Sequence, residues 1–221
     1  MMCDARLWAP QVARFESGRT VQAFVPAGGD TMEAIARTIL AQAPERFALA
    51  GLSLGGIVAM EMLRLAPERI ERLALLDTNH LPEGPERHAL RRRQIADARS
   101  GRLAAVMRDE MKPNYLADGP NRGAILDLCM AMALDLGADV FEAQSHALMH
   151  RRDQSDTLAA FRGPALVMCG AQDALCPPAR HDEIAALIPD ADRVTAQGAG
   201  HLVTLEAPDK ANEALARWLH K

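Results

Sequence analysis

Residues 51–55 read Gly-Leu-Ser-Leu-Gly, and the segments on either side of them constrain the fold of this chain more than any other feature. The apolar residues Phe47–Ala50 predict a short strand, and Ile57–Leu65 is apolar nearly all round, which predicts a buried helix. A serine between glycines at such a strand-to-helix turn is typical of a nucleophile exposed above the edge of a sheet. We expect glycines here because a Cβ would collide with neighbouring backbone.

The rest of the chain alternates short apolar runs with helical patterns. Further strands are predicted over Val21–Pro26, Leu73–Leu76, Ala165–Cys169 and Arg193–Ala196, and helices over Thr31–Ala43 and Pro208–Leu219. Strands separated by helices favour a mostly parallel sheet with helices on both faces. The sequence therefore predicts the α/β class.

Residues 82–161 interrupt this alternation. The segment has few β-branched residues, and helices are predicted over Glu86–Ala98, Arg102–Met111, Arg122–Leu136 and Ala138–Met149. We expect a single domain, residues 1–221, with a helical cap inserted at about 82–161. Because such insertions lie over the strand ends, this cap is expected to roof a pocket. A plain helical subdomain on the sheet edge is the alternative.

Composition excludes several classes of protein. With 25 basic and 29 acidic residues the formal net charge is −4, so no overall positive field draws the chain to nucleic acid or to an anionic membrane. Cys3, Cys129, Cys169 and Cys176 form no metal-ligand spacing and no dense disulfide framework. No signal-peptide pattern and no apolar run of about 18 residues is present. We expect a cytoplasmic protein without metal or cofactor; its oligomeric state is not specified.

A serine nucleophile requires a base, and seven histidines compete for that role. They are His80, His88, His146, His150, His181, His201 and His220. His201 is favoured because it follows Gly198 and Gly200 in a loop directly after the last predicted strand, from which an imidazole can overhang the sheet edge. Several of the others fall on predicted helices or near the end of the chain, although His150 remains a candidate for lining the pocket.

Two aspartates end predicted strands and could orient the base. Asp173 follows the strand Ala165–Cys169, and Asp77 ends the strand Leu73–Leu76. Asp173 is favoured because it completes the chain order Ser, Asp, His that accompanies a nucleophile on this kind of turn. Asp77 is expected instead to hydrogen-bond the next loop. The main-chain N–H of Leu54, at the start of the buried helix, is the expected oxyanion donor.

Two groups of side chains in the insertion have an ordinary and a functional interpretation. The arginines Arg87 and 91–93 are expected to form a solvated helix face, with an anionic ligand as the alternative. The methionines are expected to be mostly core, with some lining the path of an acyl chain; they are Met107, Met111, Met130, Met132 and Met149.

Residues 47–56, 67–77, 170–173 and 198–201 together carry a resemblance to the α/β-hydrolase superfamily, in its branch of small capped esterases, enol-lactonases and thioester hydrolases. The resemblance implies that Ser53 is the nucleophile, His201 the base and acid, and Asp173 its orienter. It implies hydrolysis of a small carboxylic ester, lactone or thioester through an acyl-enzyme, without a cofactor. Carbon–carbon cleavage or lyase chemistry fits the same fold. A non-catalytic ligand-binding protein or pseudoenzyme is the alternative from another class.

The resemblance also implies a strand and a glycine-containing loop before the stretch Cys3–Trp8. In the family that loop supplies a second oxyanion N–H, which by spacing would fall at Met1 or Met2. We therefore expect either a native start upstream of Met1 or a poorly active, aggregation-prone form with unpaired buried backbone groups. A shortened sheet whose strands close the gap is the alternative.

Overall fold

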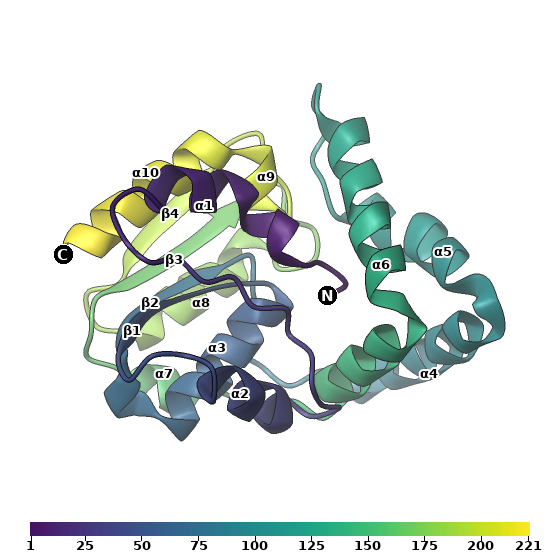
Figure 1. The fold of residues 1–221 in the computed structure, drawn as a ribbon, viewed down its shortest axis with the longest axis horizontal. Coiled ribbons are helices and arrows are strands. Elements are labelled where there is room, and N and C mark those ends of the chain that lie inside the picture. The colour runs from purple at the N-terminus through teal and green to yellow at the C-terminus, as the bar shows by residue number, and fades with distance from the viewer.

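The computed structural model describes residues 1–221 and places a four-stranded sheet between two layers of helices (Figure 1). The strands are β1 Phe47–Leu52, β2 Ile70–Leu76, β3 Ala165–Gly170 and β4 Asp192–Ala196. They are all parallel and lie in the order β1-β2-β3-β4. The α/β prediction is confirmed, and these four strands lie where the sequence predicts them, within three residues at either end.

Apolar side chains of the strands point alternately to the two faces of the sheet, so each face needs a layer of helices to bury it. Leu73 and Leu75 of β2 join the core beneath the first layer of helices, whereas Ala74 and Leu76 join the core beneath the second. The first layer holds α2 Met32–Leu40, α3 Leu54–Leu65, α7 Ser155–Ala160 and α8 Pro178–Leu187. The second holds α1 Ala9–Phe15, α9 Val203–Glu206 and α10 Pro208–His220.

The segment between β2 and β3 forms the helical arm at one end of the sheet (Figure 1). It contains α4 His88–Asp97, α5 Leu103–Ala105 and the long α6 Arg122–Met149. Single helical turns complete the chain at Ala5–Trp8, Pro67–Arg69, Pro85–Arg87, Ala98–Arg102, Val106–Met111 and Lys112–Asn114. The predicted break between two helices appears as a bend in α6 at Gly137, whose φ is +78°.

The methionines of this arm lie mostly in the interior, as expected. Met107 and Met132 are fully buried and Met149 nearly so, while Met111 and Met130 are half-buried. Met107 and Met149 belong to a separate small core between α4, α5 and α6. The insertion therefore has a small hydrophobic core, to which Met2 from the N-terminal stretch also contributes. No helix of the protein combines the length and the apolarity needed to span a bilayer.

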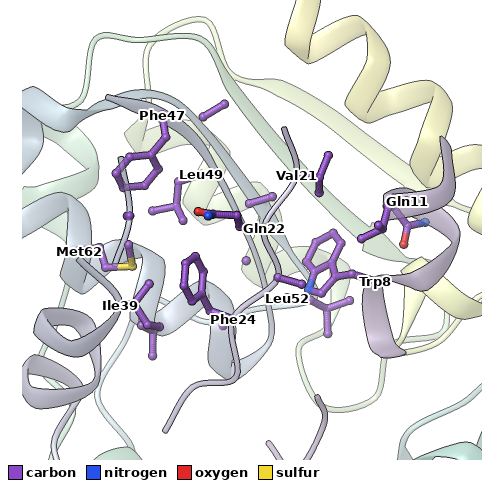
Figure 2. Close-up of a pocket in the computed structure, with 18 of the residues that line it drawn as sticks. Trp8, Gln11, Val21, Gln22, Phe24, Ile39, Phe47, Leu49, Leu52 and Met62 are labelled. Carbon is purple, nitrogen blue, oxygen red and sulfur yellow. The ribbon is translucent and has the colours of Figure 1, made fainter. Parts of the chain in front are cut away.

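The prediction of a strand over Val21–Pro26 is wrong. These residues run beside β1 without forming a ladder, so β1 is an edge strand and its outer edge makes no hydrogen bond to another segment. A cavity of about 550 Å³ separates them, lined by Phe24 and Val21 on one side and by Phe47 and Leu49 on the other (Figure 2). Alternating apolar residues give a strand one face that can be buried, but the strand also needs a neighbouring strand for its main-chain hydrogen bonds.

Candidate active site

Ser53 lies between β1 and α3 in a strained backbone conformation. Its φ of 53° and ψ of −116° are sparsely populated by residues that carry a side chain. The turn is tight: a Cβ on Gly51 would come within 2.3 Å of the Gly55 carbonyl oxygen, and one on Gly56 within 2.5 Å of Thr78 Oγ1. A Cβ on Gly55 would meet nothing within 4 Å, so the expected collision holds at Gly51 and is wrong for Gly55.

Hydrogen bonds to the loop after β2 hold this turn in place. The Ser53 N–H donates to the carbonyl oxygen of Leu76 at 2.9 Å, and the Thr78 hydroxyl donates to the carbonyl oxygen of Ser53 at 2.7 Å. The N–H of Leu54, the first residue of α3, has no hydrogen-bond acceptor. A free N–H at the positive end of a helix beside the serine hydroxyl is suited to binding a developing negative charge.

The structure brings together the three side chains that the sequence singled out. His201 Nε2 lies 2.8 Å from Ser53 Oγ, and His201 Nδ1 lies 3.0 and 2.9 Å from the two carboxylate oxygens of Asp173. Asp173 and His201 are 3% and 4% exposed, so water does not compete for these contacts. The serine hydroxyl, the imidazole and the carboxylate form one continuous hydrogen-bonded chain.

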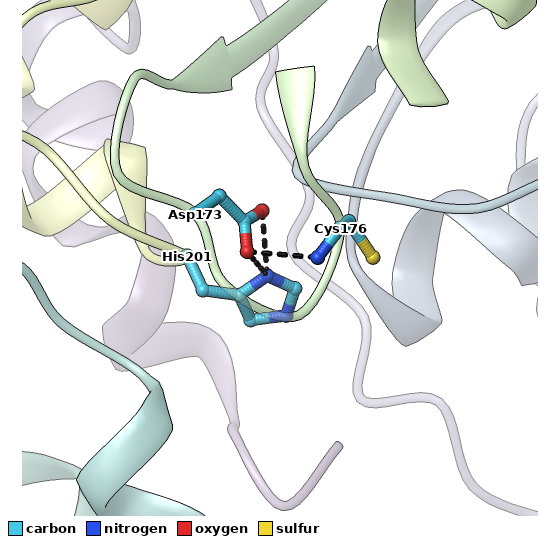
Figure 3. Close-up of side chains that lie close together, drawn as sticks. All are labelled: Asp173, Cys176 and His201. Carbon is cyan, nitrogen blue, oxygen red and sulfur yellow. Dashed lines mark hydrogen bonds and ion pairs between the residues drawn. The ribbon is translucent and has the colours of Figure 1, made fainter. Parts of the chain in front are cut away.

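The carboxylate of Asp173 is fixed by its own loop. One oxygen accepts the main-chain N–H groups of Leu175 and Cys176 at 2.8 and 2.9 Å while it faces His201 (Figure 3). The Cys176 thiol is close by, and ligand atoms of Asp173, Cys176 and His201 lie within 4.8 Å of one another. Within this trio Asp173 and His201 hydrogen-bond to each other through their side chains, and Cys176 contributes its main-chain N–H.

Asp77 serves a different purpose from Asp173, and the expected hydrogen bonds of its side chain to the next loop are replaced by bonds to two more distant segments. Its two oxygens accept the main-chain N–H groups of Gly170 and Val203, both at 2.9 Å. It is fully buried, and burial together with the negative charge of Asp173 raises its pKa well above the usual range. Asp77 therefore joins the ends of β2 and β3 to the segment that follows His201, and it makes no hydrogen bond to the imidazole.

Glu206 braces the histidine loop, and sequence reasoning missed it. One carboxylate oxygen accepts the N–H groups of Ala117 and Gly200 at 2.8 and 2.9 Å, and the other accepts the N–H of Leu202 at 2.9 Å. These bonds connect the two sides of His201 to the helical insertion. In the sequence Glu206 is visible only as an acidic residue five positions after His201. Acidic residues at such a spacing are too common to indicate a structural role.

Tyr115 is the second residue that the sequence did not reveal. Its ring lies 6.2 Å from that of His201, and its carbonyl oxygen accepts the His201 N–H at 2.8 Å. The tyrosine is 4% exposed, its hydroxyl has no hydrogen-bond partner, and burial raises its pKa. A buried hydroxyl without a partner, on a ring that neighbours a candidate catalytic imidazole, is an unusual feature.

Other histidines and the N-terminal residues occupy separate places. His150 is exposed on the arm and has no contact with Ser53, whereas His181 is buried and accepts the Thr78 N–H at 2.9 Å. The N–H of Met2 donates to the side-chain oxygen of Gln144 at 2.9 Å. The amino nitrogen of Met1 is buried, and this burial lowers its pKa.

The expectation of a solvated arginine face is wrong for one residue. Arg87, Arg92 and Arg93 are exposed, but the Arg91 side chain is only 11% exposed because it forms a paired contact with the buried Glu83. Positions 91–93 follow one another on a helix, so their side chains point in different directions. One side chain of a run of three arginines can therefore point inward while the others are exposed.

Comparisons with known proteins identify the family of this chain. The sequence profile of the Alpha/beta hydrolase family matches residues 4–214. The putative carbamate hydrolase RutD of Yersinia enterocolitica is 24% identical over 98% of this chain and 83% of its own length. The pimeloyl-[acyl-carrier protein] methyl ester esterase of Aromatoleum aromaticum is 29% identical over 83% of this chain and 78% of its own.

Solved structures resemble the whole chain. A thermophilic esterase from Thermogutta terrifontis, in a malate-bound form, superimposes with a TM-score of 0.88 at 28% identity and covers 99% of this chain and 86% of its own. The enol-lactonase from Burkholderia xenovorans superimposes with a TM-score of 0.86 at 23% identity, covering 100% and 88%. At that second identity the likeness concerns the fold alone.

Proposed function

Because this chain belongs to the α/β-hydrolase family, we propose that it is a serine hydrolase that cleaves a small carboxylic ester, lactone or thioester through an acyl-enzyme on Ser53. The observation that carries the proposal is the chain of hydrogen bonds from Ser53 Oγ through His201 to Asp173, at 2.8 and 2.9 Å. A bare hydroxyl is a poor nucleophile, and this arrangement supplies the base that activates it.

In the first step His201 Nε2 takes the Ser53 proton as the hydroxyl oxygen attacks the substrate carbonyl. Asp173 keeps the Nδ1 proton on the far side of the ring, so Nε2 is the nitrogen free to act as the base. The strained backbone at Ser53 holds the hydroxyl above the start of α3, where it faces His201. The strain is thereby part of the arrangement that positions the nucleophile.

The negative charge that develops on the carbonyl oxygen needs donors beside Ser53. We assign the free N–H of Leu54 to this role, because it lies next to the nucleophile in the chain and at the N-terminal end of α3. The second donor at Met1 that the family pattern suggests stays a prediction.

Collapse of the tetrahedral species passes the proton from His201 to the leaving alcohol or thiol and leaves the acyl group on Ser53. A water molecule then takes the place of the leaving group. His201 accepts its proton, and the acid is released as Ser53 regains its hydrogen. No step in this sequence requires a metal or an organic cofactor.

The helical insertion, expected at about residues 82–161, supplies the wall of the proposed pocket. Tyr115 and Ala117 of this segment contact the His201 loop through main-chain hydrogen bonds. Two relatives are named for different substrates, one for a methyl ester and the other for a carbamate. The reaction class is therefore better supported than any single substrate, since specificity depends on the side chains of the insertion.

The proposal is tested by covalent labelling. A fluorophosphonate probe should add once to the protein by intact mass, and Ser53→Ala should abolish both the labelling and the hydrolysis of a panel of simple esters and thioesters. Ser100→Ala, at an exposed serine whose hydroxyl donates to the Asp97 carbonyl, is the matched control and should label fully. Labelling that survives in Ser53→Ala, or a protein that never labels, contradicts the proposal and favours a non-catalytic binding protein.

A further inference from the structure

A wide slot lies beside β1, the edge strand that leads into the Ser53 turn. It is the cavity of about 550 Å³ between β1 and residues 21–26, and it is called the β1 slot below (Figure 2). Protein interiors contain few voids larger than a water molecule, and this one lies where the sheet stops. A cavity of this size is large enough to hold another molecule or another stretch of chain.

Main-chain groups on both sides of the β1 slot lack partners. The outward-facing N–H and C=O groups of β1 make no hydrogen bond to another segment. Residues 20–24 line the opposite side of the slot and form no main-chain to main-chain hydrogen bond. An edge strand with free groups is a template for a further strand. The β1 slot therefore has two unpaired edges that border the same space.

The walls of the β1 slot belong to both hydrophobic cores. Leu49 and Met62 belong to the core beneath the first layer of helices, whereas Trp8 and Leu52 belong to the core beneath the second (Figure 2). Parallel strands that are covered by helices on both faces are apolar on both faces. An occupant that continues the two cores must therefore carry apolar groups in two opposite directions.

An extended polypeptide meets both requirements, whereas an acyl chain meets only one. A hydrocarbon chain would fill the apolar space but would leave the free N–H and C=O groups of the two edges without partners. A strand has donors and acceptors along both of its own edges, and its side chains alternate between the two faces. Because β1 has six residues, a segment of about six residues would pair with its whole length.

The first residues of the chain indicate the direction of such a strand. Met1, Met2 and Cys3 line the β1 slot. The N–H of Met2 also donates to the side chain of Gln144 in α6, which belongs to the helical arm (Figure 1). This arm begins beyond the carboxyl end of β2. A strand that leads from the slot into Met1 would therefore run towards the carboxyl ends of the other strands, parallel to β1 and to the rest of the sheet.

We propose that the β1 slot is a docking site for one extended, apolar polypeptide segment that is joined to Met1 and enters the sheet as a fifth parallel strand between β1 and residues 21–26. The segment would pair with both free edges and would cover Val21, whose side chain is now 37% exposed. The inference concerns the fold and does not depend on the reaction assigned to Ser53. A separate peptide, a second copy of this chain and an apolar small molecule are the competing occupants, which the experiment distinguishes.

The test compares the chain with two extended forms. One carries seven residues of alternating valine and isoleucine before Met1, and the other carries seven residues of serine and glycine at the same place. Hydrogen exchange of residues 20–26 and 47–52 is followed by mass spectrometry, and Tm is measured. The apolar extension should slow exchange in both ranges at least about tenfold and raise Tm, because it supplies the missing hydrogen-bond partners. The polar extension should leave exchange and Tm unchanged.

Ala48→Asp is the variant that blocks the slot. Ala48 is an exposed residue of β1 that lines the β1 slot, so an aspartate there contacts water until a strand covers it. In the chain with the apolar extension, Ala48→Asp should cancel the slower exchange, because burying a carboxylate without a partner is unfavourable. Ala89→Asp is the matched control, at an exposed alanine of α4 that does not line the slot. It should keep the slower exchange.

The proposal is overturned if the apolar extension leaves exchange unchanged in both ranges, or if the polar extension slows it equally. It is also overturned if the apolar form precipitates while the polar form stays soluble, or if Ala89→Asp cancels the effect as fully as Ala48→Asp.

Three further outcomes would assign the β1 slot to another occupant and contradict the link to Met1. Equal protection by the same apolar segment added as a free peptide would indicate a separate partner. Protection of the unextended chain that rises with its own concentration would indicate a second copy. Equal protection by 1-dodecanol would indicate an apolar small molecule. Because no substrate is present, none of these results alters fluorophosphonate labelling of Ser53, which tests the proposed function separately.

Discussion

The main-chain N–H of His201 donates to the carbonyl oxygen of Tyr115 at 2.8 Å, and this bond joins the candidate base to the helical insertion. The insertion is therefore part of what positions the imidazole. Gly200 shows how close the two segments lie, because a Cβ there would come within 2.6 Å of the Ala117 main-chain nitrogen. A change in the insertion near Tyr115 would move the base as well as the pocket wall.

The two strand-end aspartates should respond differently to the same substitution. Asp173→Asn should keep the fold but lower kcat by about 10⁴, because an amide places the wrong tautomer of His201 toward Ser53. Asp77→Asn should instead lower the free energy of unfolding by about 1–3 kcal/mol, since an amide can accept only one of the two N–H groups that Asp77 now accepts. Steady-state kinetics and urea unfolding of both variants separate the effects.

Reversed outcomes would contradict this assignment. A large loss of kcat in folded Asp77→Asn, with Asp173→Asn nearly normal, would make Asp77 the orienting acid. The hydrogen bonds from Asp77 to Gly170 and Val203 would then need another explanation.

Glu206 should act on stability and on the histidine loop together. Glu206→Ala leaves three main-chain N–H groups without their acceptor, so the free energy of unfolding should fall by at least about 2 kcal/mol. We expect kcat to fall as well, because two of those groups flank His201. Urea unfolding and ester hydrolysis measure the two effects.

Glu213→Ala is the control for Glu206. Its carboxylate forms exposed ion pairs with Lys210 and Arg217 on α10, which contribute little to stability. It should change the unfolding free energy by less than about 0.5 kcal/mol. A Glu206→Ala protein that is as stable as Glu213→Ala would show that water replaces the missing acceptor.

The strand-turn-helix pattern around Ser53 made the fold and the three central side chains accessible from sequence. A sharp turn, a loop after the last strand and a carboxylate after the preceding strand are local signals. Glu206 and Tyr115 carry no local signal, because their contacts depend on segments that the fold brings together. The bond between Glu206 and Ala117, for example, joins residues 89 positions apart.

The sequence was also misleading where burial depends on a neighbour. Val21–Pro26 has the alternation of a strand, yet nothing pairs with it and it borders a cavity beside β1. Arg91 belongs to a run that looks solvated, yet Glu83 draws it inward. Both errors have the same cause. The residue types in a segment indicate whether it prefers to be buried, but they do not show which other segment it contacts.

His181 should make the fold sensitive to mild acid. Burial lowers its pKa to about 4 from 6.5, and its Nε2 accepts the Thr78 N–H, which only the neutral ring can do. The unfolded chain binds a proton below pH 6.5 while the folded chain resists it until about pH 4. Stability from this group is therefore present above pH 6.5 and is lost as the pH falls through that window.

The measurement is the free energy of unfolding in urea at pH 7 and at pH 4.5. The unsubstituted protein should lose about 2 kcal/mol more than His181→Gln between these values, since the amide oxygen can accept the Thr78 N–H without titrating. His150→Gln, at an exposed histidine, should keep the pH dependence of the unsubstituted protein. Equal losses in all three proteins would show that His181 does not control the acid response.

The two glycines that flank Ser53 should not be equivalent. Gly51→Ala places a methyl group 2.3 Å from the carbonyl oxygen of Gly55, and because this atom belongs to the backbone of the turn, the clash cannot be relieved by a side-chain rotation. The variant should lose at least about 3 kcal/mol of stability or fail to fold.

Gly55→Ala meets no atom within 4 Å and lies in the first turn of α3, where alanine is preferred over glycine by up to about 1 kcal/mol. It should fold with unchanged or slightly higher Tm and keep fluorophosphonate labelling at Ser53. Thermal unfolding of the two variants, with labelling of each folded protein, tests both expectations. A stable, labelled Gly51→Ala would show that the turn can accommodate a Cβ at this position. An unfolded Gly55→Ala would show that a glycine at position 55 is required for a reason other than steric space.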